Sequence, residues 1–88
     1  MKVKENFVLR EVAGSWLVVA TGAACNDFNG MLSLNESGAM LFRILQEGCD
    51  EEKLVSSLEK EYEVNHTIAA TDVTAFLDSL RQAGCLEE

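Results

Sequence analysis

The segment from Phe28 to Gly38 constrains the fold most, because a short apolar strand within it leads directly into a helix. Residues 31–34 are Met, Leu, Ser and Leu, and the side chain of Asn35 can cap the first turn of a following helix. Glu36 is favourable beside the positive end of that helix. A strand this short is typical of a sheet edge, whose unpaired N–H and C=O groups can pair with another extended chain. The segment therefore predicts a docking edge next to a helix.

Two further strands are expected before this segment. Residues 7–13 alternate in polarity, with Phe7 and Leu9 on one face, and the run breaks at Gly14. Residues 16–21 are rich in aromatic and β-branched side chains, which favour strands. The two runs predict a hairpin, and the third strand joins them in a three-stranded antiparallel sheet.

Three helices are expected after the sheet. The first begins after Asn35 and ends at Gly48, the second is capped by Asp50, and the last runs from about Ile68 to Ala83. The cap of the last helix is either Asn65 or Thr67. The side chains expected to be buried are Met40, Leu41, Ile44 and Leu45, then Leu54, Val55, Leu58 and Tyr62, then Ala69, Val73, Phe76, Leu77 and Leu80. The sequence therefore predicts an α+β fold.

Size and composition favour one small binding domain over residues 1–88. With 88 residues and 48% hydrophobic side chains, the chain can build one core but has little room for an enclosed catalytic cavity as well. No apolar run approaches the roughly 18–20 residues needed to cross a bilayer, so a cytoplasmic protein without membrane contact is expected. Cys25, Cys49 and Cys85 form no C-x-x-C pair, which argues against a disulfide framework and a zinc site.

The distribution of charge bears on the choice of partner. Residues 45–88 contain three basic and eleven acidic side chains, and this difference equals the whole net charge of −8. The electric field of this excess negative charge repels phosphate backbones and attracts basic peptides, so nucleic acid is not an expected partner.

Catalytic and cofactor motifs are not evident. His66 is the only histidine, no nucleophile motif accompanies it, and it is expected to lie in an exposed loop. No glycine-rich phosphate loop occurs. We therefore expect no catalytic residue, no metal site, no cofactor and no enzymatic activity.

A second line of residues lies beside the apolar stripe of the last helix. Ile68, Asp72, Ala75 and Ser79 recur at helical spacing and are mostly small or polar. Small side chains leave space for a groove, and a peptide paired with residues 31–34 could direct alternate side chains toward Ile68 and Phe76. The alternative is a helix face that is simply open to water, and the pattern alone does not separate the two.

Several segments resemble one known family, the coenzyme PQQ synthesis protein D (PqqD) family, whose members are also called peptide-recognition elements of ribosomally made, modified peptides (RiPPs). The similar segments are Leu9-Arg10-Glu11-Val12-Ala13-Gly14, Phe28-Asn29-Gly30, Leu34-Asn35-Glu36-Ser37-Gly38, Asp72-Val73, Phe76-Leu77, Leu80 and Gly84-Cys85-Leu86. Trp16 and Cys25 match no motif, so they are interpreted as structural.

The resemblance implies a winged helix-turn-helix-like domain that acts as a non-catalytic peptide-binding adaptor. It implies that a precursor's leader peptide adds a strand to the third strand, packs against the third helix and is handed to a modifying enzyme, often a radical S-adenosylmethionine (SAM) enzyme. The residues implied for backbone pairing are Gly30, Met31, Leu32 and Ser33, and those implied for the side-chain pockets are Ile68, Asp72, Ala75, Phe76 and Ser79.

The same architecture serves winged-helix DNA-binding regulators, which place a helix in the major groove, but only Arg81 is basic between His66 and Glu88. An enzyme would need a partner chain or cofactor to complete its site. An unpaired strand edge can also meet its own copy, so a homodimer is an open alternative. The sequence leaves open which precursor and enzyme are involved, and whether the product is PQQ or another peptide.

Overall fold

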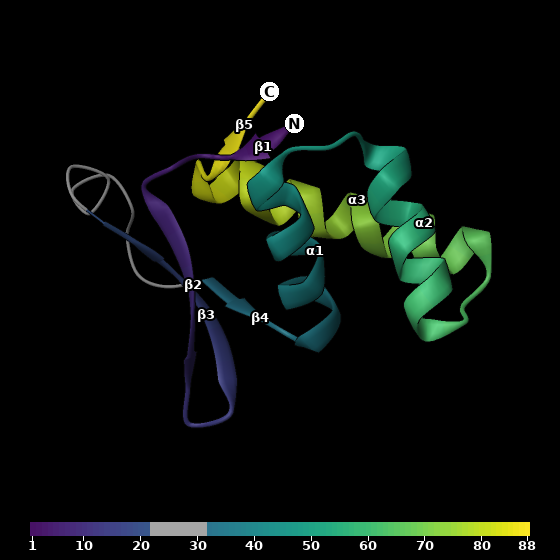
Figure 1. Cartoon of the computed structure of the whole chain (residues 1–88), viewed down its shortest axis with the longest axis horizontal. Coiled ribbons are helices and arrows are strands. Elements are labelled where there is room, and N and C mark those ends of the chain that lie inside the picture. The colour runs from purple at the N-terminus through teal and green to yellow at the C-terminus, as the bar shows by residue number, and fades with distance from the viewer. Residues whose placement is uncertain (22–31) are drawn as a thin grey trace.

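The computed structural model describes residues 1–21 and 32–88, where a three-stranded sheet precedes three helices (Figure 1). The strands are β2 (Phe7–Val12), β3 (Ser15–Ala20) and β4 (Leu32–Leu34), antiparallel in the order β2-β3-β4. The helices are α1 (Glu36–Glu47), α2 (Glu51–Tyr62) and α3 (His66–Ala83). This arrangement confirms the predicted α+β fold class.

A two-residue turn closes the hairpin of β2 and β3. Val12 lies opposite Ser15, so the turn consists of Ala13 and Gly14, with φ angles of 51° and 82°. A two-residue hairpin loop with positive φ at both central positions is the type I′ turn, which Asn-Gly favours. Ala13 therefore occupies a left-handed conformation that an alanine side chain disfavours.

Replacing Ala13 by asparagine is expected to stabilise the domain by about 0.5–1 kcal/mol, because asparagine tolerates the left-handed conformation. Thermal or urea unfolding of Ala13→Asn against the parent measures the change. Gly14→Ala is the matched control and is expected to lower stability, since it places a side chain at a φ of 82°. A lower stability for Ala13→Asn would contradict this account of the turn.

Asparagine and aspartate side chains start all three helices. Asn35 accepts a hydrogen bond from the Gly38 amide at 2.8 Å, and Asp50 accepts one from the Lys53 amide at 2.9 Å. Asn65 caps α3 by accepting from the Ile68 amide at 2.9 Å. Of the two caps considered for α3, Asn65 is therefore the one used, and the helix begins two residues before the predicted start.

The core lies between the helices and one face of the sheet. The buried hydrophobic side chains in the described residues are Val3, Phe7, Val18, Ala39, Leu41, Phe42, Leu45, Leu54, Val55, Leu58, Ala69, Val73, Phe76, Leu77, Leu80 and Cys85. Two predictions about the helices were wrong. Phe42 is completely buried although the predicted stripe of α1 omitted it, whereas Met40 and Ile44 of that stripe are only half-buried. Tyr62 is 41% exposed although it was expected in the core. Tyr62 is the last residue of α2, where the helix ends at the surface.

The two ends of the described chain form a separate pair of strands that the sequence analysis did not anticipate (Figure 1). β1 (Lys2–Val3) and β5 (Leu86–Glu87) pair antiparallel, with Val3 opposite Leu86. The Lys4 amide donates to the Cys85 carbonyl at 2.9 Å. This pairing holds the end of α3 against the first residues of the chain.

Candidate functional site

β4 is an edge strand of the described sheet. It pairs with β3 along one side, and none of the strands in residues 1–21 and 32–88 pairs with its other side. The backbone groups that point to this open side can be identified from the hydrogen-bonding pattern of the hairpin.

Thr21 and Asn6 form a hydrogen-bonded pair of this ladder, because the Thr21 amide donates to the Asn6 carbonyl at 2.7 Å. This pair continues the register in which Phe7 lies opposite Ala20. Hydrogen-bonded and non-hydrogen-bonded pairs alternate along an antiparallel ladder. The backbone groups of every second residue counted back from Thr21 therefore bond to β2. The residues that alternate with these, including Trp16 and Val18, direct their backbone groups to β4.

The same alternation applies to β4 itself. Leu34 lies opposite Trp16 and Leu32 opposite Val18, so these two residues bond to β3. Ser33, between them, directs its N–H and C=O to the open side. Ser33 is thus the described residue whose backbone is available to an added strand.

The side chains of β4 divide between the two faces of the sheet. Leu32 and Leu34 are half-buried and pack against the core, whereas Ser33 is exposed. Gly38 lets α1 start close beside this strand, because a Cβ at position 38 would lie 3.3 Å from the Leu34 Cβ. Leu32 and Leu34 therefore hold β4 against the core, and Ser33 is open to solvent.

The predicted line on α3 is exposed along its whole length. Ile68 is 48% exposed, and Asp72, Ala75 and Ser79 are exposed as well. Ile68 is one of three exposed large hydrophobic residues in the described part of the chain. Phe76, predicted as a pocket residue, is only 8% exposed and belongs to the core.

β4 and α3 meet the same core. Leu32 and Leu34 pack against the cluster that contains Phe76 and Leu77, while the neighbours of β4 in the fold are β3 and α1. The groove expected between the strand and the α3 line stays a prediction. Gly30 and Met31, the other two predicted pairing residues, lie outside the described residues.

The charges on α3 do not suit a DNA-binding helix. Arg81 lies within 3.3 Å of an Asp78 oxygen and within 2.9 Å of a Glu88 oxygen. These contacts raise the pKa of Arg81 and lower that of Glu88, mainly through the hydrogen bond that joins them. A helix whose arginine is already paired, and which exposes Asp72 and Asp78, lacks the free cations that phosphate binding needs. The DNA-binding alternative is therefore not supported.

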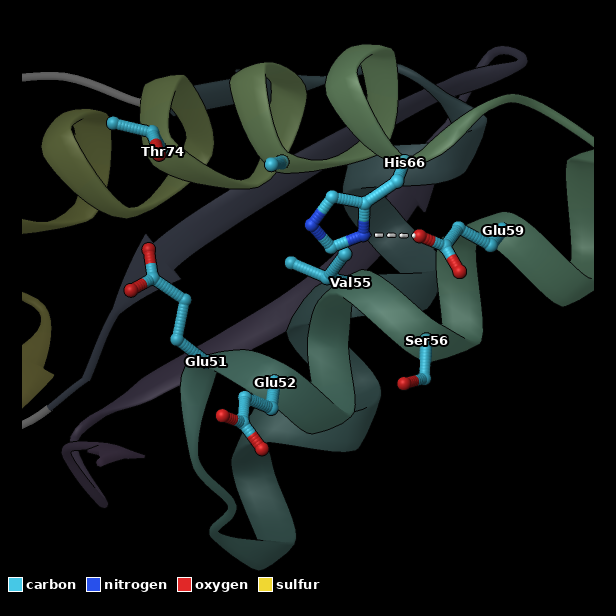
Figure 2. Close-up of a pocket in the computed structure, with 8 residues that line it drawn as sticks. Glu51, Glu52, Val55, Ser56, Glu59, His66 and Thr74 are labelled. Atoms are coloured by element: carbon cyan, nitrogen blue, oxygen red, sulfur yellow. Dashed lines mark hydrogen bonds and ion pairs between the residues drawn. The ribbon is translucent and has the colours of Figure 1, made fainter.

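His66 is not in a loop, contrary to expectation, because it is the first residue of α3. Its Nδ1 lies 2.7 Å from Glu59 Oε1, and Figure 2 shows the ring turned toward that carboxylate. The pair borders an open hollow of about 510 Å³ between α2 and α3. Ser56 and Thr74 also line it, but no hydrogen bond in the described residues joins either hydroxyl to His66. The hollow thus holds no nucleophile paired with a base.

Neither a metal-binding cluster nor a membrane-spanning helix occurs in residues 1–21 and 32–88. The described residues contain no group of three or more His, Cys, Asp or Glu side chains that could hold a metal ion. Within the same residues, none of the helices has the length and apolar character required to cross a membrane.

Cys85 is completely buried, and burial raises the pKa of its thiol from 9.0 to about 11. In the unfolded chain the thiol ionises near pH 9, before the folded state does, so deprotonation favours unfolding. We expect stability to fall as pH rises from 9 toward 11, and Cys85→Ala to lose less stability over that range than the parent. Urea unfolding at pH 8 and 10.5 measures the difference. Equal pH dependence in the two proteins would contradict it.

Comparisons with known proteins give one family and a shared fold. The sequence model of the family described as coenzyme PQQ synthesis protein D (PqqD) matches residues 8–86. No curated protein sequence matches the chain significantly. The chain is similar to the solved structure of TbiB1 in complex with the TbiA(beta) leader peptide, with 22% identity, a TM-score of 0.79, and coverage of 99% of this chain and 95% of that one. It is also similar to lasso peptide synthetase B1 complexed with the leader peptide, with 20% identity, a TM-score of 0.77, and coverage of 99% and 96%. At these identities the likeness establishes the fold.

Proposed function

This chain belongs to the coenzyme PQQ synthesis protein D family, and on that premise we propose that it is an adaptor that binds the leader of a ribosomally made precursor peptide by strand addition. The observation that carries the proposal is the open edge of β4, where Ser33 directs its N–H and C=O away from β3. Strand addition supplies main-chain hydrogen bonds, and pockets for alternate side chains supply selectivity.

The exposed line of α3 supplies the second part of the proposed site. Ile68 offers an exposed apolar surface, while Ala75 and Ser79 are small enough for a peptide to pack closely. In the proposal Gly30, Met31, Leu32 and Ser33 form the strand beside which the leader lies, and Ser33 is its described residue that hydrogen-bonds to the leader. Ile68, Asp72, Ala75, Phe76 and Ser79 contact the side chains of the leader. The two solved structures of the same fold are themselves complexes with leader peptides, which supports leader binding as the function.

The adaptor has no chemistry of its own in this proposal and presents the bound precursor to a modifying enzyme. A radical SAM enzyme is the partner we propose, with PQQ or another modified peptide as the product. The site of action is the cytoplasm, where ribosomes release the precursor. Because a homodimer formed through β4 would occupy the same edge, dimerisation and leader binding exclude each other.

The test is a titration with leader peptides taken from short reading frames of the genome that encodes this chain. The fluorescence anisotropy of the labelled leader is expected to rise to saturation as protein is added. A scrambled peptide of equal composition is expected to bind at least tenfold more weakly. Equal binding of the two peptides would contradict sequence-selective capture. Gel filtration of the free protein over a range of concentrations shows whether the competing dimer forms.

A further inference from the structure

The hairpin tip, the end of β4 and the start of α1 surround a second open hollow of about 380 Å³. Its lining residues are Glu11, Gly14, Ser15, Trp16, Ser33, Leu34, Asn35 and Glu36. The lining combines two acidic residues with an aromatic and an aliphatic one, and it includes Ser33 and Leu34 of the edge strand β4.

Strand register determines what an added peptide brings to this hollow. Glu11 lies opposite Trp16, and Trp16 lies opposite Leu34, so the three side chains form one row across the sheet. Val18, two residues from Trp16 on the same face, is completely buried, so this face is the one that meets the core. A peptide residue that exchanges hydrogen bonds with Ser33 in an antiparallel ladder places the preceding residue of the peptide opposite Leu34, as the fourth member of the row.

Charge indicates the kind of side chain that suits this position. Glu11 and Glu36 form no ion pair with any described residue, so two unpaired acidic residues line the hollow. Arg43 is the basic side chain near the row, and its guanidinium carbon lies 4.4 Å from the centre of the Trp16 ring. Two acidic groups and one basic group leave one negative charge.

We propose that this hollow is a selectivity subsite for a lysine or arginine side chain of the bound peptide, at the residue opposite Leu34. The aliphatic part of such a side chain packs along Leu34, and the negative charge of Glu36 and Glu11 attracts its charged end. Arg43 already covers one face of Trp16, so the carboxylates supply the attraction for the incoming cation. The subsite rests on the proposed function, because it exists only for a peptide paired with β4.

The test uses a combinatorial library of acetylated nine-residue peptides selected on the immobilised protein. Some selected peptides will lose binding in the Ser33→Pro variant. In these peptides, lysine or arginine is expected at one fixed position roughly three to ten times more often than in the unselected library. In the Glu11→Gln/Glu36→Gln variant the ratio is expected to fall to about one. Glu61→Gln/Glu87→Gln, which removes the same charge from exposed sites elsewhere, is the control and is expected to keep the preference.

Charge reversal gives a second readout, since Glu36→Lys is expected to select aspartate or glutamate at the same position. If binders depend on Ser33 but show no basic preference, or keep it in the double glutamine variant, the subsite is wrong while the proposed function stands. If no binder depends on Ser33, the subsite and strand addition at β4 both fail.

Discussion

Replacing Ser33 by proline is expected to reduce affinity for the leader peptide by at least about 100-fold while the domain stays folded. Proline removes the amide that points to the open side of β4, and its ring occupies the place of the incoming strand. The ladder with β3 is preserved because it uses Leu32 and Leu34. Leu32 is already extended, as a residue before proline should be.

Ser33→Ala is the matched control for this change. It removes the exposed hydroxyl and keeps the backbone amide, so leader affinity is expected to stay within about twofold of the parent, since an exposed side chain contributes little. Anisotropy titrations measure both variants, and circular dichroism with thermal unfolding checks that each is folded. A folded Ser33→Pro protein with parental affinity would mean that the leader does not pair with β4. Loss of affinity in Ser33→Ala would point to the side chain instead of the backbone.

Truncating Leu77 to alanine is expected to lower the free energy of unfolding by about 3–4 kcal/mol, because the side chain is fully buried at 0% exposure and the cavity left behind cannot close completely. A domain of this size has a total stability of roughly 4–13 kcal/mol. The expected fall in Tm is on the order of 15–25 °C. Leader affinity measured well below the new Tm is expected to change little, since Leu77 faces the core and not the exposed line of α3.

Ser79→Ala on the same helix is the control for Leu77→Ala. Ser79 is exposed, and its hydroxyl donates only to the Ala75 carbonyl one turn earlier, at 3.1 Å. Its removal is expected to change stability by less than about 0.5 kcal/mol. Urea unfolding monitored by circular dichroism gives both values. A loss below about 1.5 kcal/mol for Leu77→Ala would contradict the burial of this side of α3.

Local signals in the sequence predicted the ends of the helices well. Asn35 and Asp50 cap the first two helices as expected, because a cap needs only the backbone amides of the next turn. Gly48 and Gly84 end α1 and α3 with φ angles of 91° and 75°, conformations that glycine adopts without strain. The start of α3 was placed late because Thr67, inside the first turn, was an equally acceptable cap by sequence.

Features that depend on distant contacts were harder to predict. The pairing of β1 with β5 joins segments of two residues from opposite ends of the described chain, too short for any periodic signal. In α1 apolar side chains occur on most sides, so the pattern could not show that Phe42 faces the core more fully than Met40 or Ile44. The choice of face there is made by packing against β1, β2 and α2.

For the candidate site, the sequence predicted which residues share one line of α3, and their role in peptide binding stays a prediction. The exposed line of α3 follows from helical spacing, and the residues on it are exposed as that spacing requires. The role of Phe76 was less clear, because a residue at the border of the apolar stripe can serve either the core or a pocket, and the structure buries it. The sequence could not show that Ser33 directs its N–H and C=O to the open side of β4, because this depends on the register of three strands.

The most direct test of strand addition is a nuclear magnetic resonance titration of ¹⁵N-labelled protein with the leader peptide. We predict that the Ser33 amide shifts downfield, becomes protected from solvent exchange and shows nuclear Overhauser contacts to peptide backbone protons, together with shifts in residues 68–79. Saturable binding that leaves the Ser33 amide exposed and unshifted, with the changes confined to the hollow between α2 and α3 or to β2, would contradict the account.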